Sequence, residues 1–171
     1  MKIVLLGYMG SGKSTIGSLL AKELNICFLD LDAYIEEAEE KPISTIFSEN
    51  GEVYFRKKEA ESLRKILERN DDFVVAIGGG TPCYANNMKA IVETTPNVFY
   101  LKVSIEELVR RLSKEKSKRP LIKNIPDQEL PEFVSKHLFE RSFFYSQALH
   151  NIYCDQKATV EIVAEIKAIL S

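Results

Sequence analysis

A short glycine-rich stretch with one lysine has the composition of a phosphate-binding loop. Residues 7–15 read Gly-Tyr-Met-Gly-Ser-Gly-Lys-Ser-Thr and directly follow the apolar run 3–6. Glycines let such a loop approach phosphate closely, so that backbone N–H groups and the N-terminus of the next helix point at one anion. An accidental match in a glycine turn is the alternative, and the strand before and the helix after argue against it. We therefore expect a nucleoside triphosphate to be bound by Gly10, Ser11, Gly12, Lys13, Ser14 and Thr15.

Two side chains of this loop have separate tasks. Lys13 is placed to reach the β- and γ-phosphates. The hydroxyl of Ser14 is a ligand for Mg²⁺, because a hard cation that bridges phosphates prefers oxygen donors. The loop therefore predicts one Mg²⁺ ion bound together with the nucleotide.

Two carboxylates follow the second predicted strand. Alternation along the strand Phe28-Leu29-Asp30-Leu31-Asp32 would put both aspartates on one side of its carboxyl end, where ligands bind in open α/β sheets. One carboxylate could orient Mg²⁺, directly or through water, and the other could accept the proton of an attacking hydroxyl. Either aspartate alone could instead be a helix N-cap, and Asp32 fits this role, for a helix that begins at Ala33, as well as it fits the chemical one.

An arginine and a glycine turn further along are candidates for binding an acid. Arg56 lies on a predicted helix, and its guanidinium can bind a carboxylate with two parallel hydrogen bonds. A solvated arginine on a charged helix is the alternative. The third strand leads into the three glycines 78–80, which implies that a ligand or a neighbouring helix comes close to the backbone there.

A lysine-rich stretch, residues 113–130, interrupts the apolar periodicity and is predicted to be a mobile surface segment. Basic loops of phosphoryl-transfer enzymes often close over the triphosphate, which shields the reaction from water and stabilises the developing charge. A solvated charged loop is the alternative. Arg119 lies within the stretch, and Arg141 follows on a late helix.

Composition is that of one domain without nucleic-acid or membrane partners. The chain has 171 residues, 45% of them hydrophobic, and a formal net charge of −2, with no long basic tract. No apolar run approaches the roughly 18 residues that span a bilayer, and no cleavable leader follows Met1, so we expect a cytoplasmic protein. Cys27, Cys83 and Cys154 lack metal or redox spacing and are expected to be reduced and structural, with a reactive thiol as the alternative.

Runs rich in β-branched and aromatic residues alternate with helical patterns. Strands are predicted at 2–6, 26–30, 73–77, 97–103 and 151–154. This alternation is typical of the α/β class, in which helices cover both faces of a parallel sheet. Helices are predicted after the phosphate loop, from Pro42 to a break at Gly51, over 52–69 and over 131–149.

In their order along the chain these features resemble the shikimate kinase family. The resemblance spans nearly the whole chain and rests on the phosphate loop, the Phe-x-Asp-x-Asp strand end, Phe55-Arg56, the Gly-Gly-Gly-Thr turn, Arg119-Pro120-Leu121 and the helix of Arg141. It implies a three-layer P-loop kinase fold with a five-stranded parallel sheet of order 2-3-1-4-5 and a mobile lid. It also implies a single domain over 1–171, with the phosphate loop at 7–15, a substrate-binding helical region at about 32–62 and a lid at about 112–125.

The resemblance also implies a reaction and a role for each candidate residue. Members of the family transfer the γ-phosphoryl group of ATP to the 3-hydroxyl of shikimate, on the pathway to chorismate and the aromatic amino acids. Catalysis would then rest on Lys13, Asp32 and Arg119, and shikimate would be bound by Asp32, Arg56, Gly78, Gly79, Gly80 and Arg141. The six loop residues named above and Arg119 would bind the nucleotide, and Ser14 and Asp30 would hold Mg²⁺. ATP and shikimate are then the partners, and we expect a monomer.

Rival functions and some contacts stay open. A gluconate or nucleotide kinase of the same branch would share the phosphate loop, but need not combine it with the other motifs. A nucleotide switch of the GTPase kind would need an Asn-Lys-x-Asp motif, which the chain lacks. Arg110 or Arg111 could line the adenine, or both could be helix-surface charges. His137 and His150 are expected to be surface or packing residues, because no partner stands at metal spacing.

Overall fold

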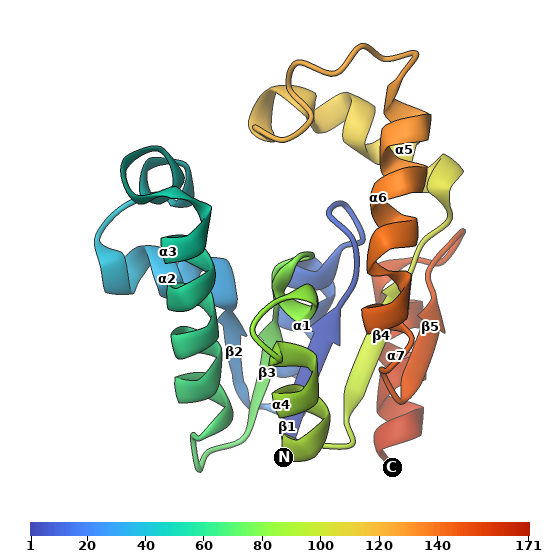
Figure 1. Ribbon diagram of the computed structural model, residues 1–171. Coiled ribbons are helices and arrows are strands. Elements are labelled where there is room, and N and C mark those ends of the chain that lie inside the picture. The colour runs from blue at the N-terminus through green and yellow to red at the C-terminus, as the bar shows by residue number, and fades with distance from the viewer.

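The computed structural model describes all 171 residues. They form three layers, with a parallel sheet between two layers of helices (Figure 1). The five strands are hydrogen-bonded in the order β2-β3-β1-β4-β5. The predicted fold class and strand order are therefore confirmed. Because β1 is the central strand, the glycine-rich loop that follows it emerges at the middle of the sheet.

Each predicted strand is present to within one residue at either end. The strands are β1 (Lys2–Leu6), β2 (Cys27–Asp30), β3 (Phe73–Ala76), β4 (Val98–Lys102) and β5 (His150–Tyr153). The central strands are continuous apolar runs because helices cover both of their faces. Leu5 of β1 lies opposite Ala76 of β3 and Phe99 of β4. This register brings the carboxyl ends of the three strands to one edge, where their loops meet.

Helices on both faces of the sheet complete one core of 38 buried residues. In Figure 1, α1 (Lys13–Leu24) and α7 (Thr159–Leu170) lie behind the sheet, and α4 (Asn87–Thr94) and α6 (Leu130–Tyr145) lie in front. The predicted helix over 131–149 is too long, because α6 gives way to tight turns after Tyr145, in which Ala148 N bonds to Tyr145 O. No helix has the combination of length and apolar character that crossing a bilayer requires.

Two helices form a lobe beside the sheet, at the left of Figure 1. Helix α2 (Leu31–Glu39) follows β2 directly, and α3 (Ile43–Leu67) follows α2. Gly51 interrupts α3 with φ 82° and ψ 174°, so that a short first part meets a long second part at a kink. The predicted break at Gly51 is therefore confirmed, and the long part ends at Leu67 rather than at residue 69.

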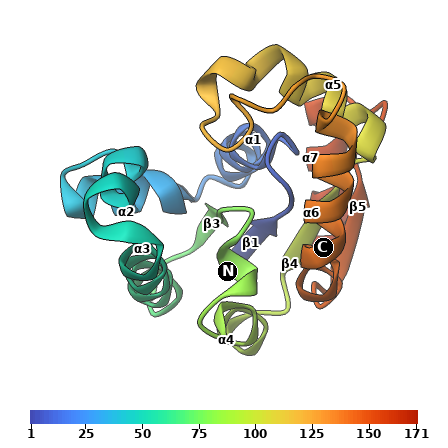
Figure 2. The same ribbon diagram turned by 45° about the horizontal axis from the view of Figure 1, so that its top comes forward.

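On the other side, α5 (Ile105–Glu115) leads into the segment expected to be a lid. Ser104 caps α5 by accepting a hydrogen bond from the backbone N–H of Glu107, and a 3-10 turn over Lys116–Lys118 follows the helix. The lysine-rich stretch 113–130 is not wholly a surface loop, because it begins inside α5 and the side chains of Ile122 and Leu130 are fully buried. Figure 2 shows the segment between α5 and α6, yellow to orange, beyond the carboxyl ends of the strands and across a gap from α2 and α3.

We expect Gly51→Ala to lower the free energy of unfolding by about 1–3 kcal/mol, because residues with a Cβ hardly populate this backbone conformation. Crowding is not the cause, since a Cβ at Gly51 would have no heavy atom within 4 Å. Unfolding in urea measures the change. Asn50→Ala, at an exposed neighbouring position, is the control and should alter stability by less than about 0.5 kcal/mol. A Gly51→Ala variant as stable as the parent protein would show that this backbone conformation does not strain a residue with a Cβ.

Candidate active site

The glycine-rich loop between β1 and α1 is held in a conformation that favours glycine. Gly10 and Gly12 have φ values of 81° and 89°, and Gly12 is the N-cap of α1. The N-terminus of α1 is thereby turned toward the cleft above the sheet, where an anion can bind it. The backbone N–H of Ser11 is used inside the loop, where it bonds to Tyr8 O at 3.1 Å.

Lys13 is held by carbonyl oxygens of the same loop. Its Nζ donates hydrogen bonds to Gly7 O at 2.9 Å and to Tyr8 O at 3.1 Å. Burial lowers the pKa of Lys13 to about 8, and the positive charges of Arg119 and Arg141 act in the same direction. A bound phosphate would offset both effects, so the unliganded site favours the arrival of an anion.

Ser14 and Asp30 bring two oxygen atoms together at the start of α1. Ser14 Oγ donates a hydrogen bond of 2.6 Å to Asp30 Oδ2. The other oxygen, Asp30 Oδ1, accepts the backbone N–H groups of Asp32 and Ala33 and so caps α2. A hydroxyl and a carboxylate in contact are a donor set that fits a hard cation such as Mg²⁺.

The N-cap of α2 is Asp30, so the capping alternative is confirmed for Asp30, whereas the alternative in which Asp32 caps a helix starting at Ala33 is wrong. Alternation along a strand is also the wrong reason for placing the two aspartates together, because β2 ends at Asp30 and Asp32 lies in the first turn of α2. The helix begins two residues early because the Asp30 side chain satisfies its first backbone N–H groups. Both carboxylates nevertheless line the same cavity.

The carboxylate of Asp32 is crowded by other acids. Partial burial, together with the negative charges of Asp30 and Glu59, raises its pKa to about 6 against the opposing effect of Lys13. A carboxylate with a raised pKa is a better proton acceptor than an ordinary aspartate, while still ionised at neutral pH. Asp32 thus has the properties expected of a base or of an acceptor that orients a hydroxyl.

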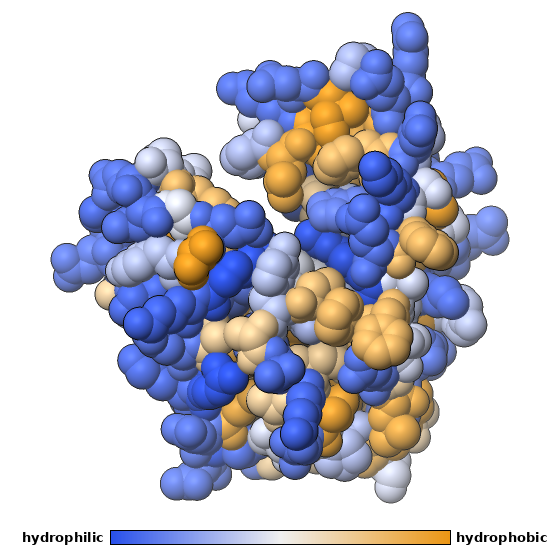
Figure 3. Space-filling model, viewed as in Figure 1, coloured by the Kyte–Doolittle hydropathy of each residue, from blue (hydrophilic) through white to orange (hydrophobic).

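Two cavities adjoin at the carboxyl edge of the sheet. The first, of about 570 Å³, is lined by the glycine-rich loop, by Asp30 and by the arginines of α5. The second, of about 840 Å³, lies between α3 and α6. They share a wall formed by Met9, Asp32, Gly78, Gly79 and Arg119. In Figure 3 the notch between the lobe of α2 and α3, at left, and the lid, at upper right, has mainly hydrophilic residues along the lobe and a hydrophobic patch on the lid.

Arg56 is fixed in the second cavity by a buried carboxylate. Its Nη1 lies 2.8 Å from Oε2 of Glu59, which is 1% exposed, and Thr81 donates a 2.7 Å hydrogen bond to Glu59 Oε1. The guanidinium also lies over the ring of Tyr84, 4.0 Å from its centre, and its buried Nε has no hydrogen-bond partner. Arg56 is therefore not a solvated helix-surface charge: it is pre-oriented and keeps unused donors.

Sequence reasoning missed Glu59. The available signal was its position three residues after Arg56, which places the two side chains on one face of a helix. Nothing in the local sequence indicates burial, because Lys57, Lys58 and Glu61 around it read as a solvated charged face. The burial depends on Thr81, which packs against α3 from a distant part of the chain.

The glycine turn after β3 gives two arginines access to the backbone. A Cβ on Gly79 would lie 2.9 Å from Arg141 Nη1, and a Cβ on Gly80 would lie 3.0 Å from Arg56 Nη2 and 3.4 Å from Arg141 Nη2. The approaching groups are side chains of the neighbouring helices α3 and α6, so the second of the two alternatives considered from the sequence, a neighbouring helix, is confirmed. Tyr145 OH, also on α6, donates a 2.5 Å hydrogen bond to Gly79 O and fixes the turn.

The remaining arginines of the site belong to α5 and the lid. Arg119 Nε and Nη2 both donate to Glu115 Oε2, at 3.0 and 2.8 Å. Arg110 and Arg111 both pair with Glu107, and Arg111 also donates to Gly10 O at 3.1 Å. All three arginines line the first cavity. Arg111 is thus tied to the phosphate loop, whereas Arg110 is paired only with its own helix.

The cysteines and histidines lie mostly as expected. All three cysteines are free thiols, but only Cys154 is buried; Cys27 is exposed, so the expectation that it is structural is wrong there. His150 stacks on Phe99. His137 is half-buried on α6, and its Nδ1 lies 2.9 Å from Tyr8 OH.

Comparison with known proteins gives matches along the whole chain. The family model for shikimate kinase matches residues 9–171. A shikimate kinase from Flavobacterium psychrophilum is 49% identical over 169 residues, which cover 99% of this chain and 98% of that protein. The crystal structure of a shikimate kinase from Bacteroides thetaiotaomicron has a TM-score of 0.92 and 36% identity, covering 99% of this chain and 98% of that one. The solved structure of a shikimate kinase from Acinetobacter baumannii in complex with shikimate has a TM-score of 0.88 and 31% identity, covering 99% of this chain and 92% of that one.

We expect Glu59→Gln to lower the free energy of unfolding by about 2–4 kcal/mol, because it leaves the guanidinium of Arg56 in the cleft without its buried counter-charge. Glu52→Gln is the matched control. Glu52 also faces Arg56, at 3.6 Å, but its side chain is 58% exposed, so the loss should be below about 0.5 kcal/mol. Unfolding in urea measures the free energy of unfolding of both variants. Equal losses would mean that the burial of Glu59 does not contribute to stability.

Proposed function

The chain belongs to the shikimate kinase family, and on that premise we propose how its residues carry out the reaction. That reaction is transfer of the γ-phosphoryl group of ATP to the 3-hydroxyl of shikimate, giving shikimate 3-phosphate and ADP on the pathway to chorismate and the aromatic amino acids. Transfer of this kind passes through a loose transition state, so the enzyme chiefly aligns the reactants and neutralises charge. The observation that carries the proposal is the pair of adjoining cavities, one beside the phosphate loop and one beside two converging arginines.

Shikimate occupies the second cavity in this proposal, with its carboxylate between Arg56 and Arg141. The two guanidiniums come from different helices and converge on Gly80. Planar forks of this kind bind a carboxylate with good geometry. The turn of Gly78, Gly79 and Gly80 leaves room for the ring beside the backbone. The substrate-binding region of about 32–62 thereby supplies one arginine, and α6 supplies the other.

ATP occupies the first cavity, with its phosphates against Gly10, Ser11, Gly12, Lys13, Ser14 and Thr15. The two carbonyl bonds of Lys13 are replaced by bonds to phosphate oxygens, because an ionic partner is stronger than a neutral carbonyl. Mg²⁺ would be held by Ser14 Oγ and, directly or through water, by Asp30, and would neutralise charge on the phosphates. Arg111 on the wall of this cavity lies toward the nucleotide.

Asp32 joins the two halves of the site. It lies on the wall shared by both cavities, where the acceptor hydroxyl must meet the γ-phosphoryl group. Its carboxylate accepts the hydrogen bond of the 3-hydroxyl and directs the oxygen along the line of transfer. It can also take the proton, late in the reaction, since a loose transition state does not require early deprotonation.

Arg119 reaches the phosphates when the lid of about 112–125 closes. It lines both cavities, and both of its hydrogen bonds go to Glu115. This pair is exposed enough to be weak, so the triphosphate competes for the guanidinium readily. The exchange moves a positive charge to the transferring phosphoryl group, where it stabilises the developing negative charge.

Release of ADP measured with ATP, Mg²⁺ and a panel of acceptors tests the function. We expect turnover with shikimate and only background with gluconate, with nucleoside monophosphates and without an acceptor. Nucleoside monophosphates offer the two arginines no carboxylate, and the open chain of gluconate does not hold a hydroxyl at a fixed distance from its carboxylate. Release with another acceptor would overturn the assignment of the acid site. Release without any acceptor would make the protein an ATPase and remove the proposed transfer.

We expect Asp32→Asn to reduce kcat by about 10²-fold or more and to change the pH profile. In the parent protein kcat/KM for shikimate should rise with pH through about 6, because the carboxylate is the active form and its pKa is about 6. The amide cannot titrate, so this acid limb should disappear. Glu37→Gln is the control, because Glu37 is exposed on the same helix and lines neither cavity. An unchanged acid limb in Asp32→Asn would assign the titration to another group.

A further inference from the structure

We propose that Tyr8 and His137 are a positioning pair that sets the orientation of Arg141 for the carboxylate of the acid. The pair joins the phosphate loop to α6 through one side-chain hydrogen bond, 2.9 Å long. This inference deepens the proposed function, because it rests on the role given to Arg141 there.

Arg141 differs from Arg56 and Arg119 in having no carboxylate partner, and from Lys13 in having no backbone carbonyl partner. Lys13 is held by carbonyls, Arg56 by Glu59 and Arg119 by Glu115. The guanidinium of Arg141 instead lies over the ring of Tyr8, with its central carbon 5.4 Å from the ring centre. An aromatic face attracts a cation without consuming its N–H donors. Arg141 therefore stays available for a ligand, but its orientation depends on that of the ring.

The ring of Tyr8 is fixed from α6. Tyr8 is 1% exposed, and its hydroxyl pairs with Nδ1 of His137, whose ring stands perpendicular to the phenol at 5.5 Å. Phe133 packs against the other side of the histidine, 5.3 Å between ring centres. Burial raises the pKa of Tyr8 to about 12, and burial and Arg141 lower that of His137, so a phenol and a neutral imidazole share this bond. In the tautomer protonated at Nε2, the phenol donates and Nδ1 accepts.

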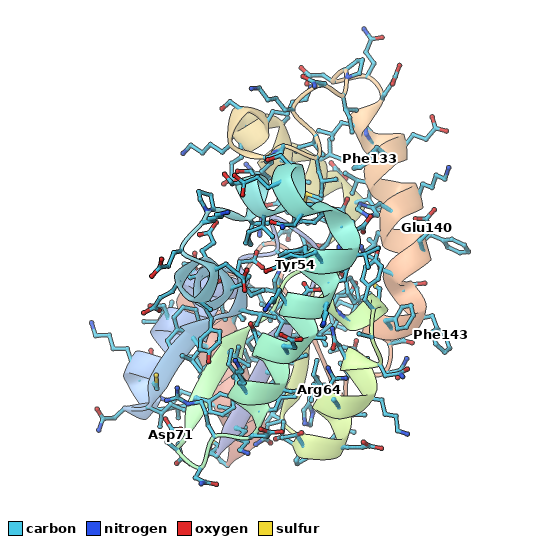
Figure 4. The ribbon with its side chains drawn as sticks, turned by 60° about the vertical axis from the view of Figure 1, so that its left-hand side comes forward. Tyr54, Arg64, Asp71, Phe133, Glu140 and Phe143 are labelled. Carbon is cyan, nitrogen blue, oxygen red and sulfur yellow. The ribbon has the colours of Figure 1, made fainter.

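The spacing of residues along α6 places His137 and Arg141 on the same face of the helix. His137, Arg141 and Tyr145 recur every four residues and so form one stripe of the helix. His137 and Arg141 both line the acid cavity. Figure 4 shows Glu140 and Phe143 on the side of α6 turned away from α3, and Phe143 is 71% exposed. A single helical face thus supplies both the arginine and the histidine that holds the ring beneath it.

The side chain and the backbone of Tyr8 contact residues of different substrate sites. Its ring serves Arg141, whereas its backbone carbonyl accepts the hydrogen bond of Lys13 at 3.1 Å. Removal of the hydroxyl leaves the carbonyl in place. Loss of the pair should therefore weaken binding of the acid without disturbing ATP, a pattern that a general loss of packing would not produce.

Steady-state kinetics of Tyr8→Phe, His137→Leu and the double variant test the pair. We expect KM for shikimate to rise by about 3- to 10-fold in each single variant, the loss of one hydrogen bond, with kcat and KM for ATP within two-fold of the parent. The double variant should be no worse than the worse single one, because both remove the same bond. His137→Asn should restore KM to within two-fold, since its Oδ1 can stand where Nδ1 stands. Tyr100→Phe is the matched control, because Tyr100 is also buried but its hydroxyl has no hydrogen bond.

Three results would overturn the pair: an unchanged shikimate KM in Tyr8→Phe, additive losses in the double variant, or an Asn variant as weak as the Leu variant. Arg141→Ala distinguishes this failure from failure of the proposed function. If Arg141→Ala raises the shikimate KM and Tyr8→Phe does not, only the pair is wrong. If Arg141→Ala leaves it unchanged, the carboxylate site itself is wrong. Thermal unfolding of each variant confirms that the compared proteins are folded.

Discussion

Repulsion among cations is the constraint on which the arrangement of this cleft depends. Its two cavities are lined by four cations, Lys13, Arg56, Arg119 and Arg141. In the absence of a bound anion their positive charges repel one another, so each side chain needs a partner that holds it in place. Each is restrained by a different device: backbone carbonyls, a buried carboxylate, an exposed carboxylate and an aromatic face. The strengths differ accordingly, from the fixed Arg56 to the readily released Arg119. Burial is the main cause of both the lowered pKa of Lys13 and the raised pKa of Asp32, and neighbouring charges of like sign add to each shift.

The fold makes this crowding possible by bringing distant segments to one edge. With β1 between β3 and β4, the phosphate loop, the glycine turn and the start of α5 follow neighbouring strands. The helices that bear Arg56 and Arg141 then enclose the turn from opposite sides, and the absence of a Cβ at Gly79 and Gly80 lets their guanidiniums approach. A single sheet edge therefore presents two cavities with one wall in common, to which the proposed function assigns a polyphosphate and an acid.

Sequence reasoning succeeded where the signal is local. The glycine-rich loop, the strands and the break at Gly51 depend on neighbouring residues, and the structure has each of them. It failed where the position of a residue depends on a distant partner, and where two nearby residues could fill the same role. Asp30 rather than Asp32 caps α2 because of backbone geometry at the end of β2, and the burial of Glu59 depends on Thr81, 22 positions away. His137 is the packing residue that the sequence predicts, but its hydrogen bond to Tyr8 could not be predicted, because Tyr8 is 129 positions away.

The wall shared by the two cavities has a consequence for ligand design. Only Met9, Asp32, Gly78, Gly79 and Arg119 separate the two volumes, so one molecule can extend from one into the other. A compound that tethers an adenosine polyphosphate to a carboxylated ring makes the second contact intramolecular, at an effective concentration in the millimolar range for a short linker. Its affinity then depends on the length and rigidity of the tether as much as on either end. The geometry of the cleft thus prescribes a bisubstrate inhibitor, with its linker passing Asp32.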